Sequence, residues 1–224
     1  MSVRLWAILL LLLPLLAFAQ EPVPDPFKPQ PVDLAKPAPV LEEVVARLVK
    51  AKAFEANFLL TRYPKDGSRP QKIRGRLVFD NNLGLLWQVQ EPARENLWLS
   101  VSGLYRLTSQ GPELIGPDPG ILPLLQDLAS ARLDKLSQSA SLTFGESKEE
   151  WELTAKSSNG PAYELFSSVK VRGNRAVIFW IQIERKEGEI LSLRLYNLQR
   201  FPESMDKARF FFIQRRVLDS LLSH

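Results

Sequence analysis

Apolar and polar residues alternate along a succession of short runs between residues 54 and 213, and clusters of Gly, Pro, Asn and Asp separate these runs. Alternation with a period of two is typical of β-strands. The connections are mostly short, and Glu187 and Gly188 form a tight turn, so we expect a largely sequential antiparallel sheet. The predicted strands span about 54–62, 72–79, 84–90, 95–101, 104–109, 140–145, 149–155, 164–172, 176–185, 189–197 and 208–213.

Two segments have a helical period instead. From Leu41 to Val49 the apolar residues recur at helical spacing with charged residues between them, which predicts an amphipathic helix. A second helix is predicted over about 121–136, because its apolar residues repeat with a period near 3.6. The apolar stripe of each helix must cover another part of the fold.

Several of the predicted strands are apolar on both faces. In 176-AVIFWIQIE-184, Val177, Phe179 and Ile181 lie on one face, while Ile178 and Trp180 lie on the other. Such strands need cover on both sides. A strongly curved sheet would enclose its concave face and leave a lined cavity, although periodicity does not distinguish a cavity from a filled core. We therefore expect an α+β fold in which an incomplete β-barrel of about 11 antiparallel strands has helices over its concave face.

The chain begins MSVRLWAILLLLLPLLAFAQ, where Arg4 precedes an apolar segment that ends in Ala17, Phe18 and Ala19. This pattern is typical of a secretory signal peptide cleaved after Ala19, and it predicts export to the periplasm. The apolar segment is shorter than the roughly 20 residues that cross a bilayer, which favours cleavage over an uncleaved anchor. Residues 20–39 are rich in Pro and predict a flexible, extended linker that keeps no hydrogen-bonded ladder.

Composition restricts the chemistry. The formal net charge is +4 and is spread along the chain, so nucleic acid is not an expected partner. The chain has no Cys, and its single His is residue 224, where a frayed terminus is poorly suited to a catalytic triad or a metal site. Ser100 and Ser102 have no candidate base nearby in the sequence. We therefore expect no enzyme activity, no metal and no cofactor.

The order of several motifs resembles the LolA-like family of periplasmic outer-membrane lipoprotein carriers. An amphipathic helix is followed by 54-FEANF-58 and then by 75-GRLVFDNNLGLLWQVQEP-92, in which Gly75 and Leu77 match a Gly-x-Leu element. Trp87 and Pro92 stand where the family has a Trp and a Pro. The segments 151-WELTAKSSN-159 and 189-EILSLRL-195 are also similar to family strands. The likeness covers residues 40–213, which would form the half-barrel domain, followed by a helical tail over 214–224.

The resemblance implies a carrier that shelters acyl chains of a lipoprotein or lipid in an apolar cavity. Strand alternation, together with the match at Trp87, predicts that ten side chains line this cavity, and the two helices would form a lid over it. The predicted lining is Leu77, Phe79, Leu85, Trp87, Leu97, Leu99, Val177, Phe179, Ile181 and Leu193, and the predicted lid is Val44, Val45, Leu48, Leu124, Leu125 and Leu128.

Three functional classes remain open from the sequence. A carrier would be a monomer that meets inner- and outer-membrane loading and unloading proteins. A sensor or regulatory module on the same fold would instead bind a partner protein on a defined surface. An enzyme would need catalytic groups beyond the isolated serines and paired glutamates that the sequence offers. The helical tail would either close the domain or dock at a membrane surface.

Overall fold

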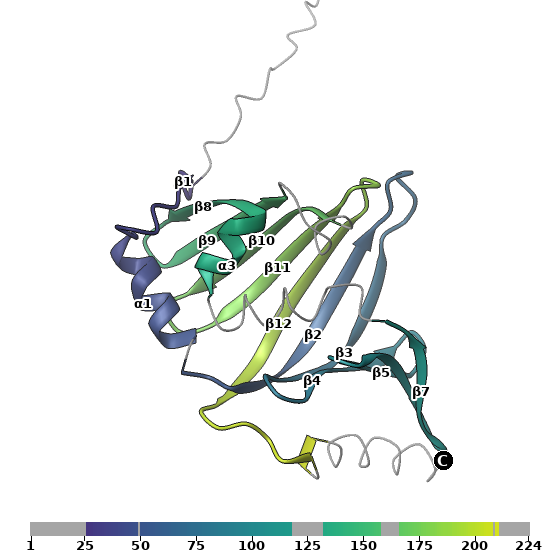
Figure 1. Cartoon of the computed structure of the whole chain (residues 1–224). Coiled ribbons are helices and arrows are strands. Elements are labelled where there is room, and N and C mark those ends of the chain that lie inside the picture. The colour runs from purple at the N-terminus through teal and green to yellow at the C-terminus, as the bar shows by residue number, and fades with distance from the viewer. Residues whose placement is uncertain (1–25, 49, 118–131, 158–165, 208, 211–224) are drawn as a thin grey trace, which may run out of the picture.

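The computed structural model describes residues 26–48, 50–117, 132–157, 166–207 and 209–210. These residues form one open sheet of 12 strands in the order β1-β8-β9-β10-β11-β12-β2-β3-β4-β5-β6-β7, together with two α-helices (Figure 1). The elements are β1 (Gln30–Pro31), α1 (Pro39–Leu48), β2 (Ala53–Tyr63), β3 (Gln71–Asp80), β4 (Gly84–Glu91), β5 (Glu95–Ser100), β6 (Gly103–Thr108), β7 (Gly111–Gly116), α3 (Leu133–Ser139), β8 (Ala140–Glu146), β9 (Glu150–Ser157), β10 (Phe166–Asn174), β11 (Ile178–Arg185) and β12 (Ile190–Phe201).

All neighbouring strands of the sheet run antiparallel, and its two edges, β1 and β7, do not meet. The predicted fold class, an incomplete antiparallel barrel with helices, is therefore confirmed. The arrangement agrees with the LolA-like fold that the sequence resemblance implies. No helix in the described ranges is long and apolar enough to cross a membrane.

Two short strands were not predicted, and one predicted strand is wrong in its described residues. β1 and β7 both contain Pro, which edge strands tolerate because one side of such a strand needs no ladder hydrogen bonds. The strand expected over 208–213 is helical at Arg209 and Phe210 instead. There the Asp206 carboxylate accepts a hydrogen bond of 2.7 Å from the Arg209 backbone N–H, a typical helix cap.

Part of the Pro-rich N-terminal segment packs on the sheet rather than behaving as a free linker. Phe27 is only 4% exposed, and the Val32 N–H donates a hydrogen bond of 3.0 Å to the Leu142 carbonyl. Gly145 on β8 allows this approach, because a Cβ there would lie 2.3 Å from the Phe27 carbonyl oxygen. The expectation that this segment keeps no ladder is thus wrong for β1, because Gln30 and Pro31 pair with β8 at the edge of the sheet, where the missing N–H of Pro31 is tolerated.

The described core consists of three apolar clusters. On the concave face one lies under α1 and α3, around Trp151 on β9, and a second surrounds Phe58 on β2. The third lies on the convex face, where Val78 packs against Met205 and Phe210 of the C-terminal segment (Figure 1). The buried Asp80 carboxylate anchors this segment by accepting a hydrogen bond of 2.6 Å from the Met205 N–H.

Candidate functional site

An apolar cavity of about 360 Å³ lies on the concave face of the sheet. Its volume is within the roughly 300–1,000 Å³ of small-molecule pockets. Every described residue that lines it is apolar, and these residues come from eight strands. They are Phe54, Leu60, Leu77, Phe79, Leu85, Trp87, Leu97, Leu99, Leu104, Phe166, Val171, Ile181, Ile183, Leu191, Leu193 and Leu195.

Strong curvature of the sheet brings these strands together. β10 and β6 both line the cavity, although six strands separate them in the sheet. In a flat sheet they would lie roughly 34 Å apart, at about 4.8 Å per strand. A single cavity can touch both only because the sheet wraps around it, and Figure 1 shows β4, β5 and β7 turning away from the direction of β11 and β12.

Strand register carries the apolar surface across the wall of the cavity. Leu99 pairs with Leu85 on one side and Leu104 on the other, and Leu193 pairs with both Leu60 and Ile181. Directly paired residues project from the same face of a sheet. A ligand in the cavity would therefore meet continuous rows of side chains and no backbone polar group, because the strands pair those groups with each other.

The floor of the cavity explains why a glycine occupies position 75. The Phe58 ring is fully buried and lies 4.4 Å from the Trp87 ring, measured between centroids. A Cβ on Gly75 would lie 1.9 Å from the Gln88 carbonyl oxygen and 2.8 Å from the Phe58 ring. Gly75 therefore leaves the space that Phe58 needs to support Trp87 from below.

The structure brings eight of the ten predicted lining residues together around this cavity and places two elsewhere. Val177 lies just before β11, beside α1, and Phe179 lies on the opposite, convex face. The reason is a β-bulge: Arg172 pairs with Trp180 but the next residue, Gly173, pairs with Ile178, which leaves Phe179 without a partner. A bulge interrupts the alternation on which the prediction for Val177 and Phe179 depended. The eight are Leu77, Phe79, Leu85, Trp87, Leu97, Leu99, Ile181 and Leu193.

Sequence reasoning missed half of the lining. Ile183 follows the same alternation as Ile181 and could have been included on that signal alone. Phe166 and Val171 on β10 could not, because only the curvature of the sheet shows that β10 reaches the cavity. The missed residues are Phe54, Leu60, Leu104, Phe166, Val171, Ile183, Leu191 and Leu195.

The predicted lid residues of α1 do not line this cavity. Val44, Val45 and Leu48 pack against Trp151 and its neighbours, over a different part of the concave face. Only a gap of about 20 Å³ remains there. The other predicted lid residues, Leu124, Leu125 and Leu128, lie outside the described residues.

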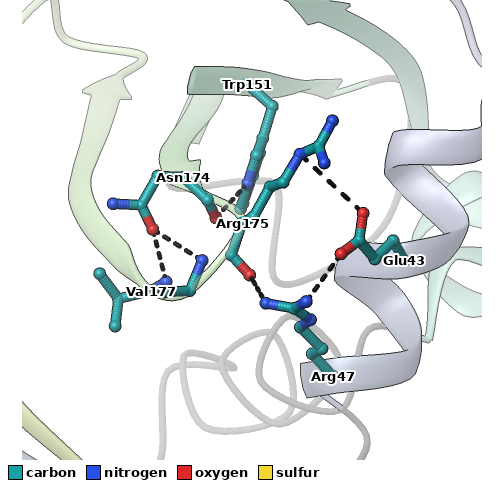
Figure 2. Close-up of polar contacts among 7 residues, drawn as sticks. Glu43, Arg47, Trp151, Asn174, Arg175 and Val177 are labelled. Carbon is teal, nitrogen blue, oxygen red and sulfur yellow. Dashed lines mark hydrogen bonds and ion pairs between the residues drawn. The ribbon is translucent and has the colours of Figure 1, made fainter. Parts of the chain in front are cut away.

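Hydrogen bonds attach α1 to the turn between β10 and β11 (Figure 2). The Arg47 guanidinium donates to the Arg175 carbonyl at 2.5 Å and to the Glu43 carboxylate at 2.7 Å. The Trp151 indole N–H donates to the Asn174 carbonyl at 2.9 Å, and the Asn174 side chain accepts from the Val177 backbone N–H at 2.8 Å. The Arg47–Arg175 contact thus joins α1 to this turn, and the contacts of Asn174 fix the turn itself.

A second, more polar groove of about 820 Å³ lies on the convex face, and Phe179 and Trp180 line it. The Arg172 guanidinium lies 4.7 Å from the Trp180 ring centroid and 4.8 Å from that of Phe27. It also donates a hydrogen bond of 2.6 Å to the buried Glu152 carboxylate. The two sites therefore offer different surfaces, because the described lining of the concave cavity is wholly apolar and the convex groove is aromatic and charged.

No ionisable side chain is among the described residues that line the cavity. Hydrogen bonds from Arg62 and Arg185 hold the pKa of the Glu189 carboxyl below its ordinary value, at the β11–β12 turn. A hydrogen bond from the Ser68 backbone likewise lowers the pKa of Asp66 in the β2–β3 turn. Within the described ranges no group of three or more His, Cys, Asp or Glu side chains could hold a metal ion. The described lining of the cavity therefore offers a ligand only apolar contacts.

The chain matches no protein-family model and no curated protein sequence. It is similar in structure to a LolA superfamily protein from Nitrosomonas europaea, with 12% identity, a TM-score of 0.42, and coverage of 75% of this chain and 94% of that one. A DUF1329 family protein from Desulfovibrio piger has 10% identity and a TM-score of 0.41, covering 76% of this chain and 95% of that one. A domain from Vibrio parahaemolyticus described as an outer-membrane lipoprotein-sorting protein has 10% identity and a TM-score of 0.37, covering 75% and 94%. Similarities at this level concern the fold and carry no functional weight.

Proposed function

We propose that this protein is a periplasmic carrier that shelters the acyl chain of a lipid or lipoprotein during transfer towards the outer membrane. The observation that supports the proposal most directly is the cavity of about 360 Å³ with an entirely apolar described lining. Proteins normally fill such space with side chains, because their interiors are close-packed. A cavity of this size and polarity is suited to an apolar guest.

The energetics of an acyl chain favour such a guest. A chain of about sixteen carbons gains on the order of 10 kcal/mol when it leaves water, at roughly 0.8 kcal/mol per methylene. The net free energy gained on binding is smaller than this. The cargo replaces contacts that the side chains of the cavity make with each other, so part of the gain is lost. A modest net affinity would allow the cargo to be passed on to the next protein.

The wall and floor of the cavity suit repeated loading. The rings of Phe58 and Trp87, with Gly75 beneath them, form a support that does not depend on the cargo. Strand pairing satisfies the backbone on either side, for example between Leu77 and Trp87. We therefore expect the walls to keep their shape while the cargo enters and leaves.

The N-terminal sequence supports the periplasmic part of the proposal. Residues 1–19 have the composition of a cleaved export signal, and these residues lie outside the described ranges. Transfer between membranes requires a donor and an acceptor, so we propose loading and unloading proteins at the inner and outer membranes as partners and a monomeric carrier between them. The proposal assigns binding rather than catalysis to the cavity, since its described lining carries no nucleophile, acid or base.

One observation favours a second candidate, a sensor module that binds a partner protein. The convex groove is lined by Trp180, Tyr196 and Arg194 among others, and Trp, Tyr and Arg dominate the binding energy of protein interfaces. Tyr196 is 45% exposed, so it is accessible to a partner. A sensor would bind this partner with or without cargo, whereas a carrier must contain cargo.

The carrier proposal is tested by filling the cavity. In Leu193→Trp the larger side chain would occupy space that the cavity already provides, so we expect the thermal stability to stay unchanged. Binding of a fluorescent fatty acid should fall at least tenfold, because the ring takes the place of the acyl chain. Arg194→Ala is the matched control, because Arg194 is the next residue on β12 and faces the convex groove.

Mass spectrometry of organic extracts of the natively purified wild type and of both variants completes the test. Acyl-containing molecules should co-purify with the wild type and with Arg194→Ala but not with Leu193→Trp. Absence of fatty-acid binding by the wild type would overturn the carrier proposal. A strong loss of stability in Leu193→Trp would show a filled core in place of a cavity.

A further inference from the structure

An arginine lies at one end of the apolar cavity. Arg200 on β12 pairs directly with Phe54 on β2, and Phe54 lines the cavity. Leu198, two positions earlier on β12, packs against the cluster around Phe58. Because side chains alternate along a strand, Arg200 projects from the same concave face as Leu198. A cation therefore lies beside the apolar lining.

This arginine differs from the other partly buried arginines that project from the sheet. Arg172, Arg76 and Arg62 each form a salt bridge with a glutamate. Arg200 is partly buried, and its guanidinium forms no ion pair or side-chain hydrogen bond with any described residue. A partly buried cation without an anionic partner is unfavourable, so its position needs an explanation.

The charges around Arg200 are predominantly positive. It lines a small gap together with Arg47, Arg175 and the apolar Ile178. Figure 2 shows that Arg47 and Arg175 share one carboxylate, that of Glu43, at 2.7 and 4.0 Å respectively. Three guanidinium groups thus border the gap, whereas one carboxylate, that of Glu43, contacts two of them, and an anion would complete the charge balance. Burial, and secondarily the charge of Arg47, lowers the pKa of Arg200.

The gap and the cavity share no described lining residue, but apolar side chains lie between them. Ile178 lines the gap and also packs against the clusters on both sides of it, the one under α1 and the one around Phe58. Phe54 borders the cavity at the position opposite Arg200. An apolar chain that reaches the Phe54 end of the cavity would therefore place its polar end on the side of Arg200.

We propose that Arg200 binds the anionic headgroup of the cargo, and that the cargo is an amphiphile whose apolar tail occupies the cavity. This inference rests on the proposed carrier function and narrows its cargo to molecules with a carboxylate or phosphate at the end of an acyl chain. The planar guanidinium forms paired hydrogen bonds with either group, and such charge-assisted bonds are stronger than bonds to a neutral hydroxyl.

The test compares three probes with the same sixteen-carbon tail: hexadecanoate, hexadecyl phosphate and hexadecanol. Each displaces a fluorescent fatty acid from the full-length protein at low ionic strength. We expect at least one anionic probe to bind about tenfold more tightly than hexadecanol, the lower end of what a hydrogen bond to a charged group contributes. The stronger of the two anions identifies a fatty-acid or a phospholipid type of headgroup.

Substitutions of Arg200 test whether this residue causes the preference for the anion. Arg200→Gln should remove the preference for the anion and leave the affinity for hexadecanol unchanged, and Arg200→Lys should retain part of it. Arg194→Gln is the control, because Arg194 is exposed on the opposite face of the same strand. A preference that survives in Arg200→Gln would overturn the assignment.

The outcomes separate this inference from the proposed function. Equal binding of all three probes by the wild type would overturn the anionic cargo while leaving a carrier of neutral lipids. Failure of every probe to bind would overturn both. A preference that disappears in Arg200→Gln, together with unchanged hexadecanol binding, would support both.

Discussion

Two regions of the concave face have the same kind of strand and different interiors. Around Trp151 the apolar side chains of β8–β10 meet those of α1 and α3, and a gap of about 20 Å³ remains. Around Phe58 and Trp87 only strands contribute to the described lining, and a cavity of about 360 Å³ remains. Alternating apolar residues thus produce a filled core where a helix packs on them and a cavity where the sheet curves around them.

The largest expected effect tests whether the filled region supplies more stability than the cavity. Trp151 is 3% exposed and packs beneath α1, so Trp151→Ala should lower the free energy of unfolding by about 3–5 kcal/mol. Leu97→Ala, in the cavity wall, should lower it by about 1 kcal/mol, because it only enlarges an existing space. Urea denaturation of both variants measures the difference, and equal losses would show that the two regions are packed alike.

The next effect concerns the floor of the cavity. In Gly75→Ala the new methyl group would meet the Gln88 carbonyl and the Phe58 ring, so we expect a loss of about 1–3 kcal/mol from overpacking. Displacement of Phe58 and Trp87 should also change Trp fluorescence and weaken acyl-chain binding. Gly67→Ala is the control for the loss of a glycine, since a Cβ there meets no atom within 4 Å, although its positive φ of 73° adds local strain. Unchanged stability in Gly75→Ala would contradict the close packing of the floor.

The smallest expected effect concerns the β11–β12 turn, at one end of two strands that line the cavity. Ionic contacts stabilise the strands at this end, whereas α1 packs at the other end. Glu189 accepts hydrogen bonds from Arg62 and Arg185, and its pKa lies below the ordinary value of 4.5. A lowered pKa means that the carboxylate stabilises the fold above about pH 4.5 and that this contribution is lost as the pH falls through the folded-state pKa.

Glu189→Gln should therefore be less stable than the wild type by about 1 kcal/mol at pH 7, and the difference should shrink as the pH falls below 4.5 and through the folded-state pKa. Thermal unfolding across this pH range measures it. Glu187→Gln, in the same turn but 63% exposed at its side chain, should have little effect at either pH. An equal effect of both substitutions would indicate a general charge effect and not the buried contact.

Much of the sheet could be predicted from the alternation of residues along the chain. The runs that became β3, β4 and β5 show it clearly, and their predicted cavity residues line the cavity. The bulge at Phe179 could not be predicted, because the extra residue is defined only relative to the partner strand β10. Arg200 lay beyond the predicted end of its strand, since pairing with β2 extends β12 to Phe201.

The pattern of side chains along the chain was sufficient to predict an antiparallel sheet with two apolar faces, because the two faces of a strand follow from its local geometry. The tertiary structure decided the closeness of β10 to β6 and the difference between filled core and cavity. It also decided the position of Arg200, which has no anionic partner among the described residues, beside the lining. These properties depend on how far the sheet curves and on which segments pack against it, and both are contacts between residues distant in the sequence.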